Sequence, residues 1–126
     1  MELIVGGAFQ GQLDYAEKLF PNISWTDGRG CSLDELCSCE GVFEFQEYIR
    51  RAMKEGQDVS DLSEILTERN PNIVVVSNEV GYGVVPVDPF DRSYREAVGR
   101  ICTKLAAYSS KVQRVVCGVG MVIKDD

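Results

Sequence analysis

The chain has 126 residues, of which 44% are apolar, so it is long enough and apolar enough to bury one hydrophobic core. Its formal net charge of -7 disfavours binding to nucleic acid or to an anionic membrane, because both attract positive charge. The absence of histidine removes the commonest general base and the usual nitrogen ligand of metal ions.

The five cysteines and the length of the apolar runs indicate in which cellular compartment the protein is found. No run approaches the ~20 apolar residues of a membrane span, and the N-terminus lacks the pattern of a signal peptide, so we expect a cytoplasmic protein with reduced thiols. Cys31, Cys37 and Cys39 have the spacing C-x5-C-x-C, which is not a zinc pattern, and we expect no metal site. Cys102 and Cys117 lie in apolar patterns and are expected to be buried.

A glycine-rich stretch follows the first predicted strand, at residues 3–5, and precedes a helix predicted at about 12–20. Gly6 and Gly11 have the spacing of the phosphate loop G-x-x-x-x-G-K-[ST], but Gln12 stands at the lysine position and Leu13 at the hydroxyl position. Such glycines can simply allow a tight turn. Main-chain N–H groups at a helix start can also bind phosphate, which makes candidates of Gly6, Gly7, Ala8, Gly11, Gln12 and Leu13.

The middle of the chain predicts mainly helices. Residues 23–25 favour a weak strand, and a capping box at Ser32 indicates a short helix. A longer helix is predicted at about 40–55, with Val42, Phe45 and Ile49 on its apolar stripe. A further helix is predicted at about 59–68, before Pro71.

The last third alternates strand, helix and strand. The β-branched run at 73–77 indicates a strand buried on both faces, and it is followed by a helix at about 88–109, a strand at 112–117 and a short edge strand at 121–123. The whole pattern predicts one α/β domain over residues 1–126, with a mostly parallel sheet between layers of helices. Ligands of such sheets bind beyond the carboxyl ends of the strands.

The loop after residue 77 is therefore expected at the edge of the sheet where ligands bind, and it supplies Asn78, Glu79 and Gly81 as candidates. The Glu79 carboxylate could accept a hydroxyl proton or hold a metal-bound water, which makes it the candidate catalytic residue. A loop glutamate that faces solvent is the alternative.

Three arginines, with Lys104 beside them, form a basic cluster on the helix predicted at 88–109. They could clamp a phosphate or a carboxylate. They could instead pair on the protein surface with Asp88, Asp91 and Glu96. The candidate residues are Arg92, Arg95 and Arg100.

Several segments resemble one family in the right order. They are the stretch from Gly6 to Gly11 with Ala16 and Glu17 after it, the run S-N-E-V-G-Y-G-V-V-P at 77–86, the basic helix and the segment 118–124. Together they resemble the adenosylcobinamide kinase / adenosylcobinamide-phosphate guanylyltransferase family of cobalamin synthesis. Residues 22–70 show no motif that can be matched to the family from the sequence alone, and we expect this segment to be shorter than its counterpart.

The resemblance implies a three-layer sandwich like that of P-loop NTPases, usually in a homotrimer. It also implies phosphorylation of a corrinoid hydroxyl with GTP or ATP and Mg²⁺, followed by GMP transfer through a guanylylated histidine. Without histidine the second step is not available, and Gln12 and Leu13 weaken the first.

We therefore expect a shortened relative that binds a nucleotide or a corrinoid with lost or weakened catalysis. One alternative is an adenosylcobinamide kinase with residual phosphoryl transfer through Glu79 and the arginines. Another is a non-catalytic oligomerising subunit.

Overall fold

A computed structural model of the chain describes residues 1–80 and 88–126. These residues form one six-stranded sheet in the order β2-β3-β4-β1-β5-β6. All neighbouring strands are parallel except β5 and β6, which form an antiparallel hairpin. The strands are β1 (Glu2–Gly6), β2 (Trp25–Asp27), β3 (Gly41–Phe43), β4 (Val74–Asn78), β5 (Lys111–Val116) and β6 (Val119–Asp125).

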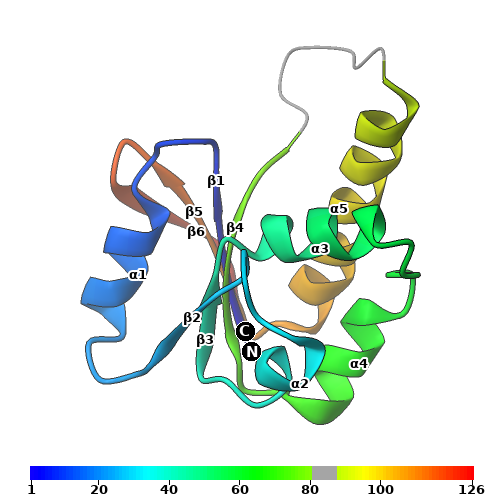
Figure 1. Cartoon of the computed structure of the whole chain (residues 1–126). Coiled ribbons are helices and arrows are strands. Elements are labelled where there is room, and N and C mark those ends of the chain that lie inside the picture. The colour runs from blue at the N-terminus through cyan, green and yellow to red at the C-terminus, as the bar shows by residue number, and fades with distance from the viewer. Residues whose placement is uncertain (81–87) are drawn as a thin grey trace.

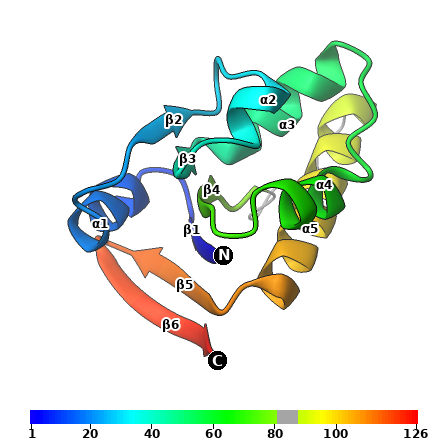
Figure 2. The same cartoon turned by 90° about the horizontal axis from the view of Figure 1, so that it is seen from below.

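Helices cover both faces of this sheet unequally (Figures 1 and 2). Among the described helices, α1 lies on one face and α2 to α5 lie on the opposite face, which gives the predicted three-layer α/β sandwich. No helix in the described ranges combines the length and apolar character that crossing a membrane requires. The helices are α1 (Gln12–Leu19), α2 (Leu33–Leu36), α3 (Phe45–Lys54), α4 (Leu62–Arg69) and α5 (Pro89–Tyr108).

The sheet separates two apolar clusters of different size. The larger one lies under α2 to α5 and includes Phe45, Ile49 and Leu105, which are fully buried. The smaller one lies under α1 and contains Ile4, Ala16, Val74, Val76 and Val115. Successive residues of β4 alternate between these clusters, which explains its unbroken apolar run.

The helix predicted at 40–55 is wrong over its first residues. Gly41 and Val42 instead belong to a strand that pairs with Val74 and Val75 of β4, and helix α3 begins only at Phe45. Between the two, Glu44 has a left-handed conformation with φ 53°, which turns the chain from strand to helix. Pairing inside the sheet has overridden the helical pattern.

The other predicted elements are present with shifted ends. Strand β2 covers 25–27 rather than 23–25, α4 covers 62–69 rather than 59–68, and β6 is longer than the predicted 121–123. The prediction that Cys117 is buried is also wrong, because Cys117 lies exposed in the turn between β5 and β6 with φ 51°.

Candidate functional site

The glycine loop joins the end of β1 to the start of α1, as predicted. Gly6 needs to be glycine because a Cβ there would lie 2.8 Å from the carbonyl oxygen of Val115. Gly11 precedes α1 with φ 82°, a conformation that glycine adopts without strain. The Gln10 side-chain oxygen accepts a 2.7 Å hydrogen bond from the N–H of Cys117, which attaches the loop to the β5–β6 turn.

A cavity of about 430 Å³ opens beside this loop. Its walls come from the loop, the first turn of α1 and the carboxyl ends of β3 and β4, where ligands of parallel sheets bind. The lining residues are Ala8, Phe9, Gly11, Gln12, Leu13, Asp14, Phe43, Glu44, Val76 and Asn78.

The amide of Gln12 is bound within the protein. Its Nε2 lies 3.1 Å from the carbonyl oxygen of Gly6, 3.0 Å from that of Gly7 and 2.6 Å from Oδ1 of Asn78. The residue is only 6% exposed. Gln12 therefore connects the loop to the end of β4, and it brings no positive charge to the position where a phosphate loop carries lysine.

The charged side chains among the described lining residues are those of Asp14 and Glu44, both acidic. The main-chain N–H groups at the start of α1 attract an anion, whereas the two carboxylates repel it. A divalent cation bound together with a phosphate would offset that repulsion. The cavity is therefore suited to a metal-complexed phosphate better than to a free polyphosphate.

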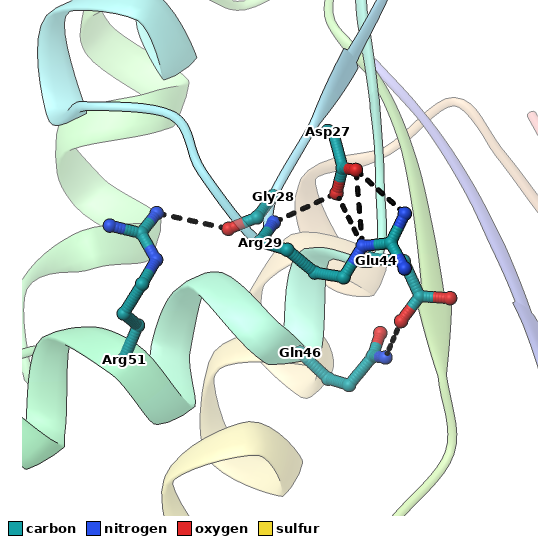
Figure 3. Close-up of polar contacts among 6 residues, drawn as sticks. All are labelled: Asp27, Gly28, Arg29, Glu44, Gln46 and Arg51. Carbon is teal, nitrogen blue, oxygen red and sulfur yellow. Dashed lines mark hydrogen bonds and ion pairs between the residues drawn. The ribbon is translucent and has the colours of Figure 1, made fainter.

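Glu44 is a site residue that the sequence analysis missed. Its Oε2 accepts a 2.6 Å hydrogen bond from Nε2 of Gln46, and Figure 3 shows these two side chains pointing toward each other. The sequence did contain a pattern typical of a ligand-binding residue, since acidic Glu44 directly follows the strand Gly41–Phe43 at its carboxyl end. It was hidden because the segment was assigned to a helix.

A partly buried chain of hydrogen bonds connects Glu44 to the glycine loop. Oε1 of Gln46 accepts a 2.9 Å hydrogen bond from the N–H of Asn78, whose side chain in turn accepts from Gln12. The hydroxyl of Tyr94 donates to the carbonyl oxygen of Gln46 over 3.1 Å, and burial raises the pKa of that hydroxyl. These bonds tie β3, α3, β4, α5 and the loop together.

An ion pair lies at the end of the neighbouring strand β2. Nε of Arg29 is 3.0 Å from both carboxylate oxygens of Asp27, and Nη2 is 2.7 Å from Oδ2 (Figure 3). The hydrogen bonds from Arg29 hold the pKa of Asp27 below its ordinary value. They also raise the pKa of Arg29, to which Glu44 adds a smaller electrostatic contribution.

Glu79, the predicted catalytic residue, faces a different cavity. Its carboxylate oxygens lie 3.0 and 3.3 Å from Nε and Nη2 of Arg114, so the charge is paired. It lines an apolar cavity of about 380 Å³ next to α5, together with Leu3 and Val5. Asn78 lines both cavities.

The predicted basic cluster also lies away from the glycine loop. Arg100 is 3.7 Å from Glu96, which matches the surface-pairing alternative, and Lys104 is 2.9 Å from Glu64, a partner that the sequence analysis did not name. Arg92 is exposed and Arg95 is half-buried on the same helix, and neither lines the glycine-loop cavity. Gly81 falls outside the described residues.

The structure thus brings together most of the predicted loop residues and Asn78 around one cavity, and Glu79, Arg92, Arg95 and Arg100 are absent from its lining. The main chain of Glu79 still contacts the loop, because its N–H donates to the carbonyl oxygen of Gly6 over 2.7 Å. Gly6 and Gly7 contribute through their carbonyl groups, which hold Gln12.

Comparison with known proteins identifies the family to which this chain is similar. The sequence model of the family described as cobinamide kinase / cobinamide phosphate guanyltransferase matches residues 36–123. Two proteins named bifunctional adenosylcobalamin biosynthesis protein CobU, from Salmonella typhimurium and Escherichia coli, are each 44% identical over 52 residues. Those residues make up 41% of this chain and 29% of each relative, so the chain matches under a third of their length.

The family match begins after the glycine loop, so the loop is assigned from its position and geometry. The match itself runs from the end of α2 into β6, well over half of the chain, and it contains Glu44, Asn78 and the whole of α5. It also includes residues 36–70, which the sequence analysis did not align with the family. On that extent, the chain belongs to the cobinamide kinase / cobinamide phosphate guanyltransferase family.

Proposed function

We propose that this chain binds a nucleotide in the cavity beside its glycine loop and has lost most or all phosphoryl-transfer activity. The observation that carries the proposal is the engagement of Gln12. A neutral amide stands at the lysine position, and its hydrogen-bond donors are bound to Gly6, Gly7 and Asn78.

This replacement affects catalysis more than binding. Removing one well-placed donor to charge that develops in the transition state costs about 3–4 kcal/mol, or roughly 10²–10³ in rate. Leu13 also lacks the hydroxyl that holds Mg²⁺ in phosphate loops. Binding still has the main-chain N–H groups at the start of α1 and the helix dipole, which do not depend on the side chain at position 12.

The acidic lining predicts that the nucleotide binds as its Mg²⁺ complex. Asp14 and Glu44 repel free triphosphate, and a cation placed between phosphate and carboxylate removes that repulsion. Because Glu44 lies at the carboxyl end of β3 and faces the cavity, it is the side chain that we expect to contact the cation.

Calorimetric titration of the full chain with GTP, ATP and cobinamide, each with and without Mg²⁺, tests the proposal. We expect heat with a nucleotide only when Mg²⁺ is present, and no phosphorylation of cobinamide above the background without protein. No binding of either nucleotide, or rapid turnover by the unaltered chain, would overturn it. Heat with cobinamide alone would favour a corrinoid-binding protein instead.

The variant Gln12→Lys restores the missing charge at the loop. It should raise affinity for Mg²⁺-GTP roughly 5- to 30-fold, since a new charge-assisted contact is worth on the order of 1–2 kcal/mol. Gln57→Lys adds the same charge at an exposed position beyond α3 and should leave affinity unchanged. Turnover that appears in the unaltered chain and falls in Glu79→Gln would instead support the residual-kinase alternative.

A further inference from the structure

Phe9 lies in the glycine loop with its ring in solvent. Its side chain is fully exposed, whereas the other exposed large apolar residues in the described part of the chain have exposed fractions between 38% and 64%. A phenylalanine stabilises a fold by burying its ring. The packing of this protein therefore does not explain why a phenylalanine stands at position 9.

The main chain of Phe9 is strained as well. Its φ of 61° lies in the left-handed region, which bulky residues seldom occupy because the Cβ atom then approaches a carbonyl oxygen. Glycine would adopt this conformation at a lower cost. Residues that keep such a conformation gather at ligand sites, where the surrounding structure enforces it.

Contacts on both sides of Phe9 hold the loop in place without using the ring. The main-chain oxygen of Gln10 accepts a hydrogen bond from the N–H of Gly118 over 2.8 Å, and the Gln10 side chain is bound to the same turn between β5 and β6. On the other side, the carbonyl oxygen of Gly7 accepts from the amide of Gln12. The loop thus positions the ring, and its exposure leaves both faces open to a ligand.

Phe9 also lines the cavity of about 430 Å³ beside the loop. The main-chain N–H groups that we propose to bind phosphate lie at the start of α1, which begins at Gln12. A base joined to those phosphates through one ribose stays close to the loop. Phe43 is the other aromatic residue in the described lining, and it packs against the small apolar cluster under α1, so the exposed aromatic face is that of Phe9.

We propose that the ring of Phe9 stacks on the base of the nucleotide bound in this cavity. The inference rests on the proposed function and adds the contact that holds the base. Every nucleobase has a π-face, and a ring stacked on it contributes to binding without reading the hydrogen-bonding edge of the base. Loss of the ring should therefore weaken GTP and ATP binding to a similar extent.

Calorimetric titration of the full chain with Mg²⁺-GTP and with Mg²⁺-tripolyphosphate, which lacks the nucleoside, tests the stacking. Phe9→Ala should weaken Mg²⁺-GTP binding by about 5- to 150-fold and leave the affinity for tripolyphosphate unchanged. Alanine keeps the Cβ atom, and the ring that it removes is exposed, so the variant should fold with the same loop. Leu19→Ala shortens an exposed side chain of α1 outside the cavity lining and should change neither affinity.

Phe9→Trp supplies a second measurement, because it keeps an aromatic face and adds a fluorescent one. It should bind Mg²⁺-GTP at least as tightly as the unaltered chain, and GTP should quench its emission more than that of the unaltered chain, whose single tryptophan is Trp25.

Three results would overturn the stacking while the unaltered chain still binds Mg²⁺-GTP and the proposed function stands. They are an unchanged GTP affinity in Phe9→Ala, an equal loss for GTP and tripolyphosphate, which would mean that the ring supports the loop, and no additional quenching in Phe9→Trp. An unaltered chain that binds neither nucleotide would overturn the proposed function, and the stacking with it.

Discussion

The Gln12 side chain shows how one residue can hold a loop in place without supplying the positive charge that phosphoryl transfer requires. Its amide bridges two loop carbonyls and the end of β4, and these bonds keep the loop next to the cavity. A lysine at this position could make similar bonds and still present its charge, because an ammonium has three donors and a full positive charge. The amide supplies fewer donors and no charge, so position 12 supports the structure of the site more than its chemistry.

Cys117 provides a residue-scale prediction on reactivity. Burial raises the pKa of the Cys31, Cys37 and Cys39 thiols, and that of Cys102 to about 11. A raised thiol pKa leaves little thiolate near pH 8, and the thiolate is the reactive form. Because Cys117 is exposed, a disulfide reagent at pH 8 should modify one thiol per native chain quickly. Cys117→Ser should remove this fast phase and Cys102→Ser should retain it, while two fast thiols in the unaltered chain would contradict the assignment.

Strand β3 and its turn to α3 depend on a close approach of Gly28, which supplies a prediction at the scale of an element. The N–H of Gly28 donates to the carbonyl oxygen of Phe43 over 2.8 Å, and a Cβ at Gly28 would overlap the carbonyl oxygen of Glu44. Since main chain cannot move aside easily, Gly28→Ala should lower the free energy of unfolding by about 1–3 kcal/mol in urea denaturation.

Gly30→Ala is the matched control for this substitution. A Cβ at Gly30 would meet nothing within 4 Å, so the change should leave stability unaltered or raise it slightly through the unfolded state. Equal stability of the two variants would show that the turn after β2 adjusts without cost.

The same elements show what could be predicted from the sequence. Long periodic stretches such as α5 and the apolar run of β4 were predicted correctly, because many residues repeat the same signal. Strand β3 has three residues, too few to show alternation, and Val42 fits a helical stripe equally well. Its assignment depends on pairing with β4, which no local pattern reveals.

The candidate site could also be predicted from the sequence only where it follows a recognisable strand. The loop and Asn78 follow recognisable strands, so their position at one edge could be deduced. Glu44 could not be found without β3. The side chain of Glu79 points away from the glycine loop, because neighbouring side chains on an extended chain face opposite sides and that of Asn78 faces the loop. The prediction that both residues line one site did not take this alternation into account.

At the scale of the whole molecule, the site lies where the three layers meet. The large cluster under α2 to α5 fixes the sheet on one side, and the small cluster under α1 supports the loop on the other. Because the small cluster contains few residues, apolar packing holds α1 less firmly than it would hold a helix over a large core. The position of α1 therefore depends more on hydrogen bonds across the edge of the sheet. Gln46 is central to those links.

Gln46 therefore supplies a prediction that concerns all three layers. Gln46→Leu keeps a similar volume but removes the acceptor for the N–H of Asn78 and the donor to Glu44. Leaving such partners unsatisfied costs about 1–3 kcal/mol, so the urea midpoint should fall while the slope stays constant. Affinity for Mg²⁺-GTP should fall as well, because both Glu44 and Asn78 line the cavity.

The control is Gln57→Leu, which changes the same side chain at an exposed position, where its amide donates to Glu55 over 3.4 Å. It should alter neither stability nor affinity by a measurable amount. If Gln46→Leu were as stable as the unaltered chain yet lost affinity, the network would orient the site without supporting the fold. If it lost stability and kept full affinity per folded molecule, the loop would hold its geometry through Gln12 and the β5–β6 turn alone.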